Sequence, residues 1–316
     1  MTPARRGRYT PSLTLAISEL QKIELERLER SRYAARLGYR VEHSDDGSAA
    51  VVLPMSEQIL NRGGIVHGGA IASAALCSGV VAAAGGADSG AARVRPLSFT
   101  LSFLAPVQSD SMTFVARTRA RGRSSVHVSI DARCGDRDIA AALGTFRIET
   151  SGADSAARFA AGARSDTTGD LPPVTISGSP YGSDAGIEIL SEIGTEARVG
   201  LPVENNTDAE GRIDPGAILG LVDNCGAFSA YSHPGTSIEQ SGATISMNVT
   251  FGAPATGALR AVGRIAARTG SAFVSEIEVA TRDGHEVAAI GTVLYRLLGA
   301  DRPDRLPDSR GGGEDA

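Results

Sequence analysis

The chain has 316 residues, a formal net charge of −5, and 42% hydrophobic against 21% charged residues. These values are typical of a globular protein with two domains and a buried core, and the acidic balance argues against a nucleic-acid partner, which would favour a basic face. Three scattered cysteines and five dispersed histidines provide neither a disulfide framework nor the ligand spacing of a metal site, and they fit a reducing cytoplasm.

The N-terminal segment predicts an amphipathic helix. Between residues 12 and 33, Leu20, Ile23, Leu25 and Leu28 alternate with glutamates. This pattern gives a helix one apolar face and lacks the uninterrupted apolar core of a signal peptide. We therefore expect a surface helix within residues 1–34 and a cytoplasmic location.

The rest of the chain shows one pattern of elements twice. Each copy is predicted to hold a pair of strands, one apolar helix, and further strands with alternating polarity. The first copy has these at 38–43, 48–53, 67–84, 94–104, 111–120, 124–134 and 138–149, and the second at 186–191, 195–201, 214–231, 243–252, 259–267, 272–281 and 285–297. The helices consist mainly of Ala, Gly and Ser, so we expect them to be buried and not to span a membrane.

Matching residues recur at an offset of 147 or 148 positions. Gly38 corresponds to Gly186, Pro54 to Pro202, and the Gly-Ala-Ile at 69–71 to that at 216–218. Their shared order indicates a duplication. A helix that is apolar nearly all round must be covered, which a curved antiparallel sheet can do. We expect an α+β class with domains at 35–149 and 181–298, a linker at 150–180, and a disordered tail at 299–316.

One segment of the first copy carries a family resemblance. Asn61 stands six residues before the His67-Gly68-Gly69 that opens the first apolar helix. This segment resembles the signature of the PaaI-like, 4-hydroxybenzoyl-CoA-thioesterase-type hotdog thioesterases, in which an Asp follows nine residues after the His. The second copy is similar to the later part of the signature, at 216–224. The resemblance implies two fused hotdog domains, each a long antiparallel sheet wrapped around a central apolar helix, and hydrolysis of acyl-CoA to free acid and CoA.

Each copy lacks a part of the signature that the other retains. The position nine residues after His67 is Leu76, whereas the second copy keeps the acid, Asp223, but has Asp214-Pro215 in place of His-Gly. Nine helical residues span about 13 Å, so an Asp cannot reach the start of its own helix. In the family's two-fold dimer, the acid of one helix faces the His-Gly-Gly of the other. The resemblance therefore implies one complete composite site and one inactive pseudo-site.

The resemblance also implies the roles of the catalytic residues. The N–H of Gly68, with that of Gly69, would stabilise an oxyanion at the start of the helix, where free donors and the helix dipole favour negative charge. Asp223 would act as general base or as nucleophile, and the sequence does not separate the two. Thr244 would orient the water or the carboxylate. Asn61 and His67 would position the thioester.

Two turns between strands are candidates for binding the CoA phosphates. Both turns place Arg beside Gly and resemble the turn that contacts CoA in relatives; the residues concerned are Arg121, Arg123, Arg268 and Ser271. The alternative is that these are solvated hairpin charges. The implied chemistry needs no metal and no redox cofactor, CoA being part of the substrate, and we expect the fused units to form a homo-oligomer.

Other interpretations remain open. His67 alone could be a helix-start residue, and the thiols and hydroxyls of Cys77, Cys225, Ser73 and Ser78 are better explained by packing. Asp223 is the only charged residue within 215–231, and burial of a carboxylate is costly without a function or a partner. One rival function is a non-catalytic acyl-CoA-binding or regulatory protein. Another is an enoyl-CoA hydratase, which would show a Gly-Asp-x-Asn-Pro-x-His stretch that this sequence lacks.

Overall fold

The computed structural model describes residues 17–87, 90–150, 174–175, 179–193, 196–237 and 240–298. Most of the predicted linker at 150–180 and the whole predicted tail at 299–316 lie outside these residues. Within the described part of the chain, no helix is both long and apolar enough to cross a membrane.

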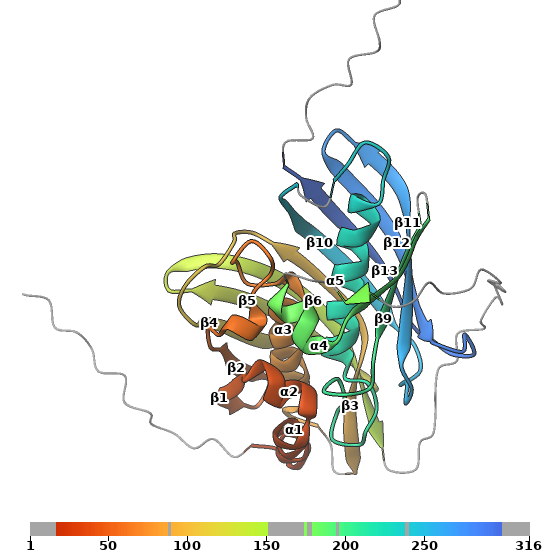
Figure 1. The fold of residues 1–316 in the computed structure, drawn as a ribbon. Helices are drawn as coiled ribbons and strands as arrows, with labels where there is room; N and C mark the ends of the chain where they lie inside the picture. The colour runs from red at the N-terminus through yellow and green to blue at the C-terminus, as the bar shows by residue number, and fades with distance from the viewer. Residues whose placement is uncertain are drawn as a thin grey trace, which may run out of the picture.

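All the described strands form one antiparallel sheet of thirteen strands (Figure 1). The first copy contributes β1 (Arg40–Asp45), β2 (Ser48–Leu53), β3 (Ala91–Phe103), β4 (Met112–Arg121), β5 (Ser125–Cys134) and β6 (Arg137–Thr150). The second contributes β8 (Glu188–Ile193), β9 (Glu196–Leu201), β10 (Gly242–Phe251), β11 (Leu259–Thr269), β12 (Ala272–Thr281) and β13 (Val287–Leu297), and β7 (Val174–Thr175) extends its edge. The order β1-β2-β4-β5-β6-β3 is mirrored by β10-β13-β12-β11-β9-β8. The predicted duplication is therefore present in the fold.

The two copies join where β3 pairs with β10. Thr100 faces Asn248 at the centre of this pairing, with Ser102 opposite Ser246 on one side and Ser98 opposite Thr250 on the other. Since equivalent residues lie 148 positions apart, this register places an approximate two-fold axis at the pair Thr100 and Asn248. The Asn248 amide donates to the Thr100 hydroxyl over 2.6 Å.

Two helices lie at the junction of the halves, α3 (Gly68–Ala84) and α5 (Pro215–Tyr231) (Figure 1). Both start one residue after the predicted positions, since His67 and Asp214 are their N-caps. Small residues let the helices touch. A Cβ atom on Gly69 would lie 2.7 Å from the Cα of Gly220, closer than real Cβ contacts come. The two helices pack together, as the composite site implied by the resemblance requires.

The N-terminal segment differs from the single surface helix expected over 12–33. It forms α1 (Glu19–Arg30) and α2 (Arg32–Leu37), separated by Ser31, whose extended backbone ends α1 and whose side chain caps α2. Helix α1 contacts α3 and β3, and it buries Leu20, Gln21 and Glu24. It is therefore part of the packed structure. The second copy contains the counterpart of α2, the short α4 (Pro180–Ala185), at an offset of 148 residues.

Candidate active site

His67 links the loop before α3 to the helix itself. It is 8% exposed, and its Nδ1 accepts the N–H of Gly69 over 3.0 Å, as an N-cap side chain does. The same nitrogen lies 3.2 Å from Oδ2 of Asp223. These two contacts exclude each other, because an unprotonated Nδ1 accepts from Gly69 whereas a protonated one donates to Asp223.

The electrostatic surroundings favour the unprotonated imidazole. Burial lowers the pKa of His67, and the nearby Arg36 lowers it further, while Asp223 and a hydrogen bond with Asn224 act in the opposite direction. A lowered pKa leaves the ring neutral at neutral pH. The Gly69 N–H that points at Nδ1 selects the neutral tautomer with its proton on Nε2, so Nδ1 accepts from Gly69 and donates no proton to Asp223.

Asp223 projects from the middle of α5 toward the start of α3. It is 4% exposed, and its Oδ1 accepts the hydroxyl proton of Thr244 over 2.5 Å. Thr244 lies at a β-bulge of β10, where the pairing with β13 shifts register. The same bulge occurs in β3 at Pro96, which has no hydroxyl to offer. The structure thus provides a polar partner for the carboxylate only on the side of the second copy.

Gly68 lies beside the Asp223 carboxylate, and this close contact explains why the position is a glycine. A Cβ atom there would lie 2.7 Å from Oδ2 of Asp223, so a side chain would displace the carboxylate. The N–H of Gly68 donates to no group among the described residues, since the helix start leaves it without an intrahelical partner. A residue with a free N–H at a helix start and a buried carboxylate therefore lie side by side.

Two other predicted residues have structural roles in this arrangement. The N–H of Gly69, expected to assist Gly68, is taken by His67. Asn61 lies in the loop before α3, and its Oδ1 accepts the N–H groups of Gly63 and Ile65 over 2.8 and 3.2 Å. Its equivalent, Asp208, makes the same two contacts within its own loop. Asn61 thus shapes the loop that delivers His67.

Among the candidate phosphate-binding residues, Arg121 lies away from His67, Gly68 and Asp223. Arg121 donates to the carbonyl groups of Ala83 and Gly85 at the C-terminal end of α3, about 24 Å along the helix from Gly68. Arg123 is exposed in the turn between β4 and β5. Arg268 stacks on Phe273 at 5.0 Å, and the buried Ser271 accepts from Arg296. The two arginines with described contacts are therefore engaged in holding local structure.

Tyr181 is a residue of the site that was not predicted from the sequence. This residue of α4 stacks on the His67 ring with a centroid distance of 4.3 Å, and its hydroxyl meets that of Tyr33 at 2.9 Å. Arg36 lies over both tyrosine rings, at 4.8 and 5.1 Å. Tyr33 and Tyr181 are equivalent residues, and the pattern Ser-x-Tyr before Gly38 and before Gly186 was available in the sequence at the offset of 148.

The cysteines and serines of the two helices pack, as predicted. Cys77 and Cys225 are buried, and burial raises the pKa of both thiols, which keeps them protonated. The hydroxyl of Ser73 donates to the carbonyl of Gly69, and that of Ser78 to the carbonyl of Ala75. None of the four has a base as its described hydrogen-bond partner.

Comparison with known proteins gives the domain type. Residues 57–147 match the family model of the acyl-CoA thioesterase N-terminal domain. No curated protein matches the chain. This segment of the first copy is thus similar to an acyl-CoA thioesterase domain.

Solved structures resemble both copies together. The tesB protein of Mycobacterium avium subspecies paratuberculosis is 15% identical with a TM-score of 0.57, over 89% of this chain and 99% of its own. An acyl-CoA thioesterase II of Mycobacterium marinum is 14% identical with a TM-score of 0.53, over 85% and 97%. A hot dog fold protein from Alicyclobacillus acidocaldarius is 18% identical with a TM-score of 0.59, over 82% and 95%. These likenesses confirm the predicted fold of two fused hotdog domains.

Proposed function

We propose that this protein hydrolyses an acyl-CoA to the free acid and CoA at the group formed by His67, Gly68, Asp223 and Thr244. The family match of residues 57–147 supports a thioester as the substrate class. The proposal depends on one observation, the free N–H of Gly68 beside the carboxylate of Asp223. Thioester hydrolysis requires these two functions, an oxyanion donor and a base or nucleophile, at a single carbonyl carbon.

In the proposed reaction the thioester carbonyl oxygen accepts the Gly68 N–H. Asp223 takes a proton from a water molecule as the water oxygen attacks the carbonyl carbon, and Thr244 holds the other carboxylate oxygen. The tetrahedral intermediate then expels the CoA sulfur, which receives the proton from Asp223. If Asp223 attacked directly, it would expel the CoA thiolate and form a mixed anhydride, which water would hydrolyse to the acid and which hydroxylamine would trap in a single turnover. Neither route uses a metal or a redox cofactor.

The equivalent position in the second helix cannot support the same chemistry. Pro215 occupies the place of Gly68 and has no N–H to donate. We therefore expect Leu76→Asp, which restores the missing acid, to leave the turnover per chain unchanged. Steady-state release of free thiol measures this, with Leu76→Asn as the uncharged control. A doubled turnover in the Asp variant alone would show that the donors have been assigned wrongly.

Gly68→Ala tests the close approach between the helix start and the carboxylate. The new Cβ would require Asp223 to move by several tenths of an ångström, away from the attacking position. We expect turnover to fall at least tenfold, since small misplacements of reacting groups cost up to about 10² in rate. Thiol release and thermal unfolding should be measured together, and a variant that kept the parental rate would contradict the assigned geometry.

The rival function is acyl-CoA binding without hydrolysis. A binding protein needs no buried carboxylate beside the thioester, and Asp223 is buried there beside a free donor. Free-thiol release from a panel of acyl-CoAs of different chain length and aromaticity decides between the two functions. Tight binding across the panel without any release would favour the rival.

A further inference from the structure

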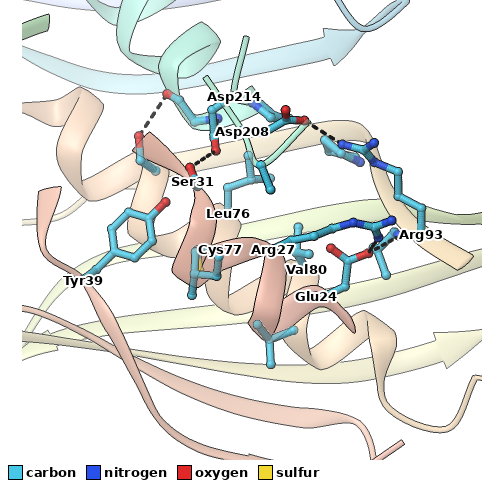
Figure 2. Close-up of a pocket in the computed structure, with 18 of the residues that line it drawn as sticks. Glu24, Arg27, Ser31, Tyr39, Leu76, Cys77, Val80, Arg93, Asp208 and Asp214 are labelled. Atoms are coloured by element: carbon cyan, nitrogen blue, oxygen red, sulfur yellow. Dashed lines mark hydrogen bonds and ion pairs between the residues drawn. The ribbon is translucent and has the colours of Figure 1, made fainter. Parts of the chain in front are cut away.

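The inactive pseudo-site contains a cavity of about 100 Å³, whose lining residues are drawn in Figure 2. It lies between α1, α3, β3 and the start of α5, at the positions equivalent to the composite site. Asp214 replaces His67, Pro215 replaces Gly68, Leu76 replaces Asp223 and Pro96 replaces Thr244, and all four replacements line the cavity. Pro215 offers no N–H at the place of Gly68 and Leu76 no carboxylate at the place of Asp223, so the cavity is suited to a different ligand.

The charge of the cavity is negative. Its lining includes four carboxylates, from Glu24, Asp208, Glu210 and Asp214, and two guanidinium groups, from Arg27 and Arg93. Both arginines are already paired, Arg27 with Glu24 and Glu210 at 2.8 and 3.0 Å, and Arg93 with Asp208 and Glu210 at 2.7 and 3.3 Å. The remaining acid, Asp214, has no cationic partner within the described residues.

Asp214 retains unused hydrogen-bonding capacity. One of its oxygens accepts the N–H of Gly216 over 2.8 Å, and the other accepts the hydroxyl of Ser31 over 3.1 Å. A carboxylate has about four lone-pair sites, so each oxygen can accept one further bond. Figure 2 shows this carboxylate beside Ser31 at one end of the cavity.

Tyr39 provides a second, independent indication of a ligand. Its side chain is 8% exposed and lines the cavity, and its hydroxyl has no hydrogen-bond partner in the described part of the chain. Figure 2 shows this hydroxyl pointing toward the region between Ser31 and Leu76. The largely buried side chain thus holds an unpaired hydroxyl at the cavity, where a ligand can bond to it.

We propose that this cavity binds a small organic cation, a primary ammonium group on a short aliphatic body. The ammonium would donate to the Asp214 carboxylate and to the Tyr39 oxygen, and the aliphatic body would lie against Leu76 and Val80. This site is separate from the composite site and does not depend on thioester hydrolysis there.

Three probes of equal chain length distinguish the contribution of charge to binding from that of apolar contact. Calorimetric titration of the full chain at pH 8 should compare butylammonium, butan-1-ol and butyrate. We expect butylammonium to bind at least tenfold more tightly than butan-1-ol, and butyrate to show no binding. Butyrate binding as tightly as butylammonium, or no butylammonium binding, would overturn the proposal.

Variants assign the binding to this cavity. Asp214→Asn keeps a good N-cap residue and removes the charge, and we expect it to weaken butylammonium binding at least tenfold. Asp138→Asn is the matched control, since Asp138 is 68% exposed and pairs with Arg133 on β5. Tyr39→Phe should weaken binding severalfold. Equal losses in the Asp214 and Asp138 variants would refute the assignment.

The pH dependence of the parent protein keeps the proposal testable should Asp214→Asn fold poorly. Burial raises the pKa of Asp214 to about 6, with Asp208 raising it and Arg93 lowering it. The other titratable groups near it, Tyr39 and Cys77, have raised pKa values and stay neutral below pH 8. Butylammonium affinity should therefore fall as the pH is lowered from 8 to 5. Burial also raises the pKa of Glu24, so the Glu24→Gln variant should be titrated beside the parent, and its butylammonium affinity should fall with pH in the same way. An affinity independent of pH in the parent would overturn the proposal.

Discussion

Replacement of Asp223 by asparagine should lower thioester hydrolysis by a factor on the order of 10²–10⁴, the contribution of a positioned base. The amide is nearly isosteric with the carboxylate, so its oxygen can still accept from Thr244, now 2.5 Å away. The packing of α5 should survive, because the change removes a buried charge and almost no volume. Acyl-CoA binding should therefore persist while turnover is lost. Steady-state thiol release and calorimetric binding, measured on the same preparations, test both parts.

His67→Ala is the comparison for this variant. The backbone N–H of Gly68 remains when the imidazole is removed, so we expect a smaller loss of rate than for Asp223→Asn. If the Asn variant hydrolysed acyl-CoA at the parental rate, the catalytic role of Asp223 would be wrong. If the parent itself were inactive across the substrate panel, acyl-CoA binding would become the preferred function.

The sequence predicted the fold well because two kinds of information agreed. The duplicated order of glycines and prolines fixed which segments are equivalent, and the alternation of apolar residues gave the strands. Helix α3, expected at 67–84, is found at Gly68–Ala84, and α5, expected at 214–231, at Pro215–Tyr231. The family resemblance further implied that Asp223 would face the start of the other helix, and the close approach of Gly68 to its carboxylate agrees with this.

The remaining features of the site depend on contacts that no local pattern encodes. Tyr181 of α4, in the second copy, stacks on His67 at the start of α3, in the first copy. This contact depends on how the two copies pack against each other. Gly69 was expected to donate its N–H to the substrate, but in the folded chain this N–H donates to the neighbouring imidazole of His67. Arg121 was a candidate for phosphate binding because of its turn, yet in the folded chain the nearest acceptors are the carbonyls that end α3.

Gly220→Ala should destabilise this helix crossing. A Cβ atom at position 220 would collide with the hydroxyl of Tyr181, and it would lie 3.1 Å from the ring carbon that bears that hydroxyl. Overpacking of this kind costs about 1–3 kcal/mol. Alanine is favoured over glycine within a helix by about 1 kcal/mol, so an observed loss of stability would be net of that gain. Turnover should fall as well, since a displaced Tyr181 no longer supports the His67 ring.

Thermal unfolding and thiol release should be compared among Gly220→Ala, Gly257→Ala and the double variant Gly220→Ala with Tyr181→Phe. A Cβ atom at Gly257 meets nothing within 4 Å, so that control should change stability by less than about 0.5 kcal/mol. The double variant removes the colliding hydroxyl but keeps the ring, so it should recover part of the stability lost by Gly220→Ala. A Gly220→Ala protein more stable than the parent by the full propensity gain of about 1 kcal/mol would mean that α5 and Tyr181 lie farther apart than described, and the support of His67 by Tyr181 would then be wrong.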